Sequence, residues 1–194
     1  MSDQPEAIVI IGGGPAGASA ATFTARADLM TVVIDADKGM TRRAWVGNHL
    51  GFAEGITGPE LVDNGRAQAE RAGAVWVEGT AESMEKDADG FTVRTDAGDT
   101  FTAPNVLLAT GTSSALAEAA GVATVPGTEP RIKTIVAVDA EGRTSVPGIW
   151  AAGTAAGVSV HTIVTSGDGA RVAINLISEV RGERHVDHDI LPAS

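Results

Sequence analysis

The chain has 194 residues, 43% of them hydrophobic, which suits a single domain with its own buried core. Its 14 lysine and arginine residues against 25 aspartate and glutamate residues give a net charge of −11, which disfavours binding to nucleic acids and to anionic membranes. The chain contains no cysteine, so disulfides, a redox-active dithiol and cysteine-ligated metal are all excluded.

A glycine-rich turn follows the first apolar run. Residues 8–11, Ile-Val-Ile-Ile, predict a buried strand, and the next six residues carry the pattern GxGxxG at Gly12, Gly14 and Gly17. This pattern allows a tight turn, a close approach of the backbone to phosphate, and a helix packed closely on the strand. The small residues from Ala16 to Ala27 predict that helix, whose free N–H groups and dipole attract an anion.

An acidic residue ends the second predicted strand. The strand Thr31–Ile34 runs into Asp35, 23 positions after Gly12, where a carboxylate can bind the hydroxyls of a ribose. Together these features predict dinucleotide binding; the alternative is an ordinary strand-turn-helix with an acid at a strand end. A carboxylate at this position also disfavours NADP, because it would meet the negative 2′-phosphate.

A long loop and a capped helix come next. Residues 37–56 show no clear periodicity, and structured loops of this length are typically functional. Thr57 and Glu60 then predict a capping box at the start of a helix that runs to about Arg71 and stops at Gly73.

Short strands are expected in the middle of the chain. Residues 75–78, 91–95 and 100–103 predict a three-stranded meander, with a hairpin turn at 96–99 and the acidic run 82–89 as a solvated edge. Residues 106–109 are continuously apolar, which is typical of a parallel strand covered on both faces. This strand ends at Thr110 and Gly111.

The last third of the chain is expected to contain two strands and a long helix. Residues 112–130 are rich in small and turn-forming residues and predict a connector with one short helix. Residues 132–139 resemble a strand, and residues 146–153 a turn that leads into a buried strand. A final helix is expected from about His161 to Arg181, ending at Gly182, followed by a polar tail at 183–194.

Five motifs in this order resemble the FAD-binding domain of the thioredoxin reductase-like flavoproteins, within the pyridine nucleotide-disulfide oxidoreductase superfamily. The motifs are IVIIGGGPAG, VVIDAD, NHLGFAEGITGPEL, VLLATG and GRTSVPGIWAAGT, and they span nearly the whole chain. In that family an NADPH-binding domain of roughly a hundred residues, which carries the active CxxC, is inserted into the FAD domain. Here the insertion point falls just after Gly111 and the second half resumes by about Ile132, so the resemblance implies that the insert is missing.

The resemblance carries FAD-binding roles over to residues from both halves of the chain. It implies that Asp35 meets the adenosine ribose, that the backbone at Ala81 meets the adenine, and that Asn48 lies beside the flavin ring. It places Gly153 and Thr154 beside the ribityl chain, and the start of the last helix against the flavin pyrimidine. The residues to which a FAD contact is carried over are Gly12, Gly14, Pro15, Ala16, Gly17, Asp35, Asn48, Ala81, Thr110, Gly111, Gly153, Thr154, His161, Thr162 and Ile163.

A few residues of the implied flavin site bear on whether the chain is an active enzyme. Thr154 stands where the family has an aspartate, so a charge-assisted hydrogen bond of about 1.5–3 kcal/mol is lost. His161 is a candidate for a proton donor near the flavin, and His49 is a weaker one; the alternative for His161 is a helix-capping or surface histidine. The sequence names no other catalytic residue.

The tryptophans and the C-terminal histidines have plainer interpretations. Trp45, Trp76 and Trp150 are interpreted as packing residues, with Trp45 alternatively lining the flavin site. The tail contains two histidines and two aspartates, but no metal site is expected there because nothing else in view would complete it. The residues of this run are His185, Asp187, His188 and Asp189.

The expected fold is a three-layer, Rossmann-like α/β FAD-binding domain with a central parallel sheet and a small three-stranded β-meander. We expect one domain over residues 1–194, whose halves, 1–111 and 131–182, are joined by the connector 112–130 and followed by the tail 183–194.

The function expected from the resemblance is that of a compact FAD-dependent oxidoreductase. It would pass electrons from an external donor, either NAD(P)H acting directly or a redox protein, through the flavin to an unidentified acceptor. The alternatives are a non-catalytic FAD carrier, sensor or subunit, and a protein that binds NAD in place of FAD. The resemblance implies a homodimer. A cytoplasmic location is expected, because the first apolar run is short and no basic region precedes it.

Overall fold

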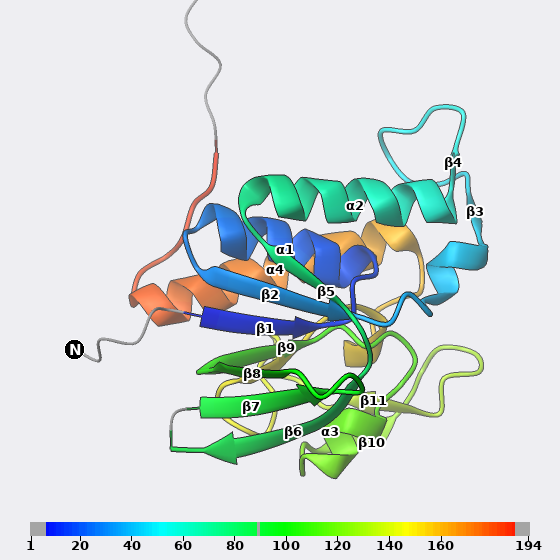
Figure 1. The fold of residues 1–194 in the computed structure, drawn as a ribbon. Coiled ribbons are helices and arrows are strands. Elements are labelled where there is room, and N and C mark those ends of the chain that lie inside the picture. The colour runs from blue at the N-terminus through cyan, green and yellow to red at the C-terminus, as the bar shows by residue number, and fades with distance from the viewer. Residues whose placement is uncertain (1–6, 89, 189–194) are drawn as a thin grey trace, which may run out of the picture.

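A five-stranded parallel sheet forms the centre of the molecule (Figure 1). The computed structural model describes residues 7–88 and 90–188. The strands lie in the order β12-β9-β1-β2-β5, and each neighbouring pair is parallel. Their bounds are Ala7–Ile11 for β1, Met30–Asp35 for β2, Val75–Glu78 for β5, Asn105–Leu108 for β9 and Ile149–Ala151 for β12.

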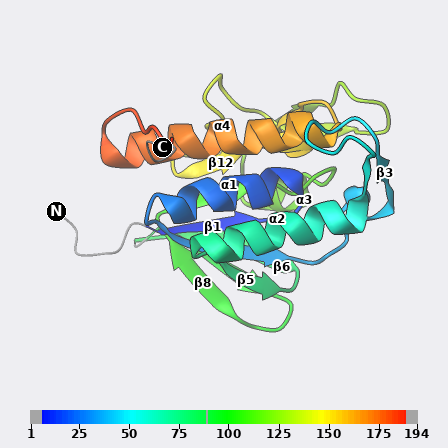
Figure 2. The same ribbon diagram turned by 90° about the horizontal axis from the view of Figure 1, so that it is seen from above.

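Three long helices cover one face of this sheet. They are α1 (Pro15–Arg26), α2 (Gly58–Ala72) and α4 (Thr162–Arg181). Seen from above, α1 lies between α2 and α4 (Figure 2). All three helices begin on the side of the molecule where the strands end, on the right in Figure 1. The N-terminal ends of the helices therefore meet the carboxyl edge of the sheet.

An antiparallel meander covers the other face, which completes three layers. Its strands are β6 (Ala81–Asp87), β7 (Gly90–Thr95) and β8 (Thr100–Ala103). The smaller elements are α3 (Ala115–Ala119), a hairpin of β10 (Thr124–Pro126) with β11 (Thr134–Val136), a two-residue pair of β3 (Trp45–Val46) with β4 (Ile56–Thr57), and 3-10 turns at Met40–Arg43 and Gly153–Ala156.

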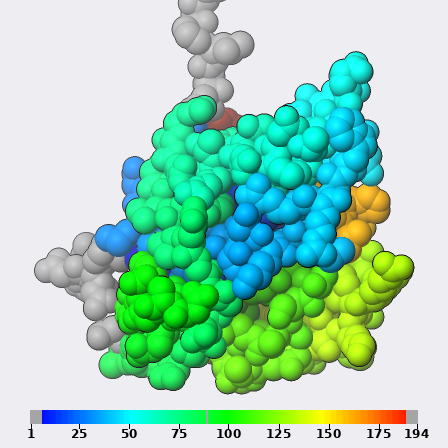
Figure 3. Space-filling model, turned by 45° about the vertical axis from the view of Figure 1, so that its right-hand side comes forward, coloured from blue at the N-terminus to red at the C-terminus, as the bar shows by residue number. Residues whose placement is uncertain are grey.

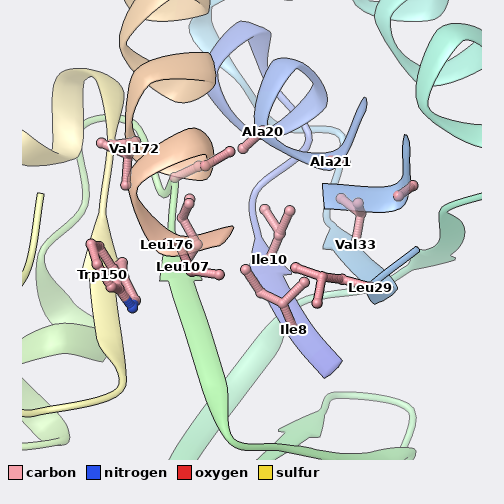
Figure 4. Close-up of a cluster of buried hydrophobic side chains, with 14 of the residues drawn as sticks. Ile8, Ile10, Ala20, Ala21, Leu29, Val33, Leu107, Trp150, Val172 and Leu176 are labelled. Atoms are coloured by element: carbon pink, nitrogen blue, oxygen red, sulfur yellow. The ribbon is translucent and has the colours of Figure 1, made fainter. Parts of the chain in front are cut away.

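Side chains that alternate along the central strands build two separate cores. Ile8 and Ile10 of β1 belong to the core between sheet and helices, whereas Val9 and Ile11 belong to the core between sheet and meander. Figure 4 shows the first of these cores, where side chains of β1, β2, β9 and β12 meet those of α1 and α4. Because both faces are covered, the parallel strands are apolar at nearly every position, as their sequences predict.

The predicted three-layer α/β fold is confirmed, but two strands have different partners from those expected. Residues 75–78 were expected in the meander, yet they form the edge strand β5 of the parallel sheet. A helix separates β2 from β5, and such a crossover returns the chain parallel to its start. The first meander strand is instead β6, in the acidic run, which turns Met84 into the core while most of its other side chains stay exposed.

The connector contains more structure than its composition predicts. The short helix expected there is α3, but residues 124–126 also pair with 134–136 as an antiparallel hairpin. The strand expected at 132–139 is thus only three residues long and lies outside the parallel sheet. Residues 127–133 join β10 to β11, and so short a connection favours antiparallel pairing, because parallel neighbours need a crossover of a dozen or more residues.

The start of the tail packs against two helices. Asp187 accepts hydrogen bonds from Nε and Nη2 of Arg26 on α1, at 2.8 and 2.7 Å. The backbone N–H of His185 donates to Ser178 Oγ on α4. Residues 189–194 of the predicted tail lie outside the described residues. Within the described ranges, no helix is long and apolar enough to cross a membrane.

Helix α4 approaches the first turn of α1 so closely that only glycine fits at the contact. A Cβ atom at Gly169 would lie 2.1 Å from the carbonyl oxygen of Ala16. A Cβ at Gly153, in the 3-10 turn that follows β12, would lie 2.7 Å from the Cβ of Ala16. The C-terminal half of the chain is therefore held against the turn that follows β1.

A matched pair of substitutions in α4 tests this contact. Gly169→Ala should destabilise the protein by about 1–3 kcal/mol, the usual cost of overpacking. Gly167→Ala, two residues away, meets no atom within 4 Å and should stabilise by about 0.5–1 kcal/mol, because alanine favours a helix interior. Urea unfolding measures both. Equal stability of the two variants would show that α4 does not lie on Ala16.

Candidate functional site

Four chain segments meet at the carboxyl edge of the parallel sheet. The N–H of Ala109, after β9, donates to Ile11 O at 2.9 Å, and the N–H of Ala152, after β12, donates to Leu108 O at 3.0 Å. The N–H of Gly12, after β1, donates to Ile34 O at 2.8 Å. In open α/β sheets, ligands bind at this edge.

Two of the three glycines of the GxGxxG turn are required by the fold itself. Gly12 has φ +103°, and a Cβ there would lie 2.3 Å from the carbonyl oxygen of Ala109. A Cβ at Gly17 would lie 1.8 Å from the carbonyl oxygen of Gly12, so the helix could not pack on the strand end. These two positions explain the shape of the turn without any ligand.

Gly14 is different, because nothing in the protein requires a glycine there. Its φ and ψ of −67° and −173° suit any residue, and a Cβ would meet no atom within 4 Å. The space next to Gly14 is therefore open, and a side chain would project into it. Such a gap beside a helix start suits an anion that contacts the backbone directly.

The starts of α1 and α4 lack the caps that α2 has. At α2, the Thr57 side chain accepts a hydrogen bond from the N–H of Glu60, and the Glu60 carboxylate accepts one from the N–H of Thr57. The hydrogen bonds that Thr57 donates lower the pKa of Glu60. The N-cap residues of α1 and α4, Gly14 and His161, make no side-chain cap hydrogen bond, and neither helix has an acid in its first turn. Unpaired N–H groups at both helix starts are thus available to a ligand.

Asp168 on α4 holds Gly153 in place, a role that the sequence analysis missed. Its Oδ2 accepts from the buried N–H of Gly153 at 2.7 Å, and its Oδ1 accepts from Nε and Nη2 of Arg171 at 3.0 and 2.8 Å. Asp168 is 8% exposed. The only signal in the sequence is an acid among the small and apolar residues of the last helix.

A histidine links the loop of residues 47–52 to the start of α4. His49 Nδ1 lies 3.0 Å from Thr162 Oγ1, and its ring packs edge-on against Phe52 with 5.6 Å between ring centres. Asn48, the residue implied beside the flavin ring, precedes this histidine and has an exposed side chain. The His49 contact therefore brings the predicted flavin loop to the predicted flavin-facing helix.

Asp35 lines a cavity of about 260 Å³ between the ends of β2 and β5. Its carboxyl carbon would lie 2.8 Å from a Cβ at Gly13, so the acid lies directly beside the glycine turn. Thr80, which precedes Ala81, lines the same cavity. The positions implied for ribose and adenine therefore lie together, and Trp76, interpreted from the sequence as packing, forms part of the wall.

The remaining predicted residues surround the same edge. Thr110 and Gly111 follow Ala109, which contacts Gly12, and the Thr110 hydroxyl donates to Ser113 O at 2.6 Å. Within the described residues, the Thr154 hydroxyl makes no hydrogen bond. His161 caps α4 with its backbone, its ring is exposed, and its Nδ1 lies 2.7 Å from Ser159 Oγ. Ile163 is 37% exposed beside it.

Figure 3 turns this side of the molecule forward and shows the segment of residues 37–57, in blue to cyan, on its surface. Trp45 in this segment is 68% exposed, so its interpretation as a packing residue is wrong; Trp150 is 2% exposed and does pack.

Across residues 7–88 and 90–188, no group of histidines and acids could hold a metal ion.

The burial of His49 predicts a pH dependence. Burial lowers the pKa of His49 from its ordinary value of 6.5, so the folded state favours the neutral ring. Stability should therefore fall as the pH drops through about 6.5, because the unfolded chain protonates first. His49→Gln should lose less stability than the wild type between pH 7.5 and 5.5, as read from melting temperatures. The control is His188→Gln at an exposed position, which should follow the wild type. An unchanged pH profile in His49→Gln would contradict the prediction.

Comparison with known proteins identifies the family. The model of the pyridine nucleotide-disulphide oxidoreductase family matches residues 6–134 and 66–174. The thioredoxin reductase of Streptomyces clavuligerus is 42% identical over 115 residues, which is 57% of this chain and 35% of that protein. The bifunctional thioredoxin reductase/thioredoxin of Mycobacterium leprae is 40% identical over 109 residues, 55% of this chain and 24% of that protein. The chain thus spans about a third or less of the length of these relatives.

Solved structures share the fold at low sequence identity. A thioredoxin reductase from Gloeobacter violaceus aligns with a TM-score of 0.81 and 18% identity, over 97% of this chain and 100% of that chain. An oxidoreductase from Agrobacterium tumefaciens aligns with a TM-score of 0.77 and 18% identity, over 93% and 100%. The resemblance predicted from the five motifs is confirmed. The chain belongs to the pyridine nucleotide-disulphide oxidoreductase family and is thioredoxin reductase-like.

Proposed function

We propose that the chain is a compact FAD-binding oxidoreductase, which takes electrons from an external donor and passes them to an acceptor through the flavin. The observation that carries the proposal is the pair of uncapped helix starts, α1 and α4, at one edge of the sheet beside the open space at Gly14. The family typically binds FAD, an elongated dinucleotide with a pyrophosphate at its middle. The residues present fit such a molecule.

The parts of FAD correspond to successive regions of this edge. The pyrophosphate would be held by the backbone N–H groups of Gly14 and Ala16 and would lie against Pro15, which has no N–H, at the start of α1, where the helix dipole supplies about half a positive charge. Asp35 would accept hydrogen bonds from the adenosine ribose. The flavin end would lie toward Asn48 and Gly153, near the uncapped start of α4.

FAD, when bound, supplies the chemistry of hydride or single-electron transfer. The chain supplies orientation and electrostatics. The free N–H groups of Thr162 and Ile163 and the dipole of α4 would stabilise negative charge that develops next to them. Asp168 fixes Gly153, and the Thr154 hydroxyl is free to donate or accept. Because these 194 residues contain no cysteine, no dithiol of this chain can take part, so donor and acceptor must reach the flavin from outside.

A non-catalytic FAD carrier, sensor or subunit is the second candidate. It is favoured by the ring of His161, the main candidate proton donor, which is exposed and has its Nδ1 engaged with Ser159. The homodimer implied by the resemblance and the cytoplasmic location expected from the sequence belong to the proposal as well. Light scattering of the purified protein tests the first, and fractionation of cells the second.

A matched pair of glycine-to-alanine substitutions tests the phosphate contact. Gly14→Ala should weaken FAD binding about tenfold or more, ~1.4 kcal/mol or above, because the methyl group occupies the space of the pyrophosphate. Gly39→Ala is the control, since Gly39 also has ordinary backbone angles and open space around its Cβ. Flavin fluorescence titration gives the affinities, and melting temperatures should be unchanged in both. Equal FAD affinity in the two variants would contradict the assigned site.

Anaerobic reduction separates the oxidoreductase from the carrier. With FAD bound, addition of NADH, NADPH or reduced ferredoxin should bleach the flavin absorbance with at least one donor. The matched control is free FAD at the same concentration, which should react more slowly. If dithionite bleaches the bound flavin and none of the three donors reacts faster than with free FAD, the carrier is supported and the oxidoreductase is contradicted.

A further inference from the structure

His49 lies between the start of α4 and a cavity in the helix layer. Its Nδ1 is 3.0 Å from Thr162 Oγ1, and within the described residues the Thr162 hydroxyl makes no other hydrogen bond. Among the same residues His49 Nε2 has no hydrogen-bond partner, and it is not one of the polar atoms buried from solvent. One side of the ring is therefore tied to the helix start, and the other can exchange a proton with water.

The cavity next to His49 carries no charge. Its volume is about 230 Å³, and it is lined by residues of α1, α2, α4 and the loop of residues 47–52. Its polar walls consist of neutral groups such as Ser19, Asn64 and Gln68, and of the described residues that line it only His49 can titrate. A polar cavity of this size holds several water molecules. Water can thus deliver a proton to His49.

No charged side chain among the described residues acts on the His49 ring. Burial alone lowers its pKa from 6.5, so the ring is neutral at pH 7. Phe52 packs against it and Thr162 faces it from α4, whose dipole has its positive end there. His161 is exposed, with Nδ1 2.7 Å from Ser159 Oγ. A negative charge that appears at the start of α4 would therefore act on His49 without competition from a fixed charge.

We propose that His49 takes up a proton from solvent when flavin bound at this site is reduced, and that the Thr162 hydroxyl transmits this change to the flavin. The inference rests on the proposed function and adds a proton-transfer role to the loop of residues 47–52. Because His49 acts through Thr162, it is a positioning residue rather than a catalytic one.

The proton balance gives the reason for a second proton acceptor. Reduction by two electrons and one proton leaves the site with one more negative charge, and an opposite charge close by raises the pKa of a histidine. The second proton comes from water and binds to the His49 ring. In the neutral ring Nδ1 can accept a hydrogen bond from the Thr162 hydroxyl, whereas in the charged ring both nitrogens donate. The hydroxyl hydrogen of Thr162 is then released and can turn toward the new negative charge.

Spectroelectrochemical titration of the FAD-bound protein counts the protons, because the slope of the reduction potential against pH gives the protons taken up per electron. The electrode supplies the electrons, so the natural donor need not be known. The wild type should take up about two protons per two electrons between about pH 6 and 8, and His49→Gln about one. Thr162→Val should also lose the second proton, whereas Thr162→Ser, which keeps the hydroxyl, should retain it. His188→Gln, at an exposed position, is the control and should follow the wild type.

NMR of the histidine rings locates the proton. The chain has four histidines, so the His49 signal is the one that His49→Gln lacks. The proton affinity of His49 should be at least about tenfold higher in the reduced FAD complex than in the oxidised one. An equal His49 pKa in both complexes would overturn the inference.

Three results of the titration would overturn it as well. They are equal proton uptake in the wild type and His49→Gln, a second proton that is lost in His161→Gln but kept in His49→Gln, and equal behaviour of Thr162→Val and Thr162→Ser, which marks a merely structural role. Absence of FAD binding by the wild type in a fluorescence titration would instead contradict the proposed function itself.

Discussion

The first turn of α1 packs directly against two glycines from the other half of the chain, Gly153 and Gly169. No larger residue fits at either contact, since an added Cβ would lie within 3 Å of Ala16. This close approach sets where α4 begins relative to the glycine turn, and Asp168 reinforces it through the N–H of Gly153. The candidate site exists only because segments more than a hundred residues apart are held at one edge of the sheet.

The three long helices begin on the same side of the molecule, but the N–H groups at their starts are satisfied differently. At α2 the chain satisfies its own N–H groups through Thr57 and Glu60, whereas α1 and α4 begin without a side-chain cap or an acid. Unpaired N–H groups cost free energy unless water or a ligand accepts from them. The two open starts therefore mark the part of the surface that is suited to an electron-rich ligand, while the capped one marks structure alone.

Local rules predicted the features that depend on neighbours in the sequence. The strand before Gly12, the capping box at Thr57, the stop at Gly73 and the last helix were all placed to within a residue or two. Pairing between segments that are distant in the sequence was harder to predict. Residues 75–78 were predicted to be a meander strand, because a short apolar run does not show that the crossover makes it parallel to β2. Asp168 was missed for the same reason, since its role arises from a contact with Gly153.

The central claim is that both halves of the chain enclose one FAD molecule, and hydrogen-exchange mass spectrometry with and without FAD tests it most directly. The account predicts slower amide exchange on FAD binding in residues 12–18 and 153–165 together, with no change in the hairpin of β7 and β8. Protection confined to one of the two segments, or none in either at saturating FAD, would contradict it.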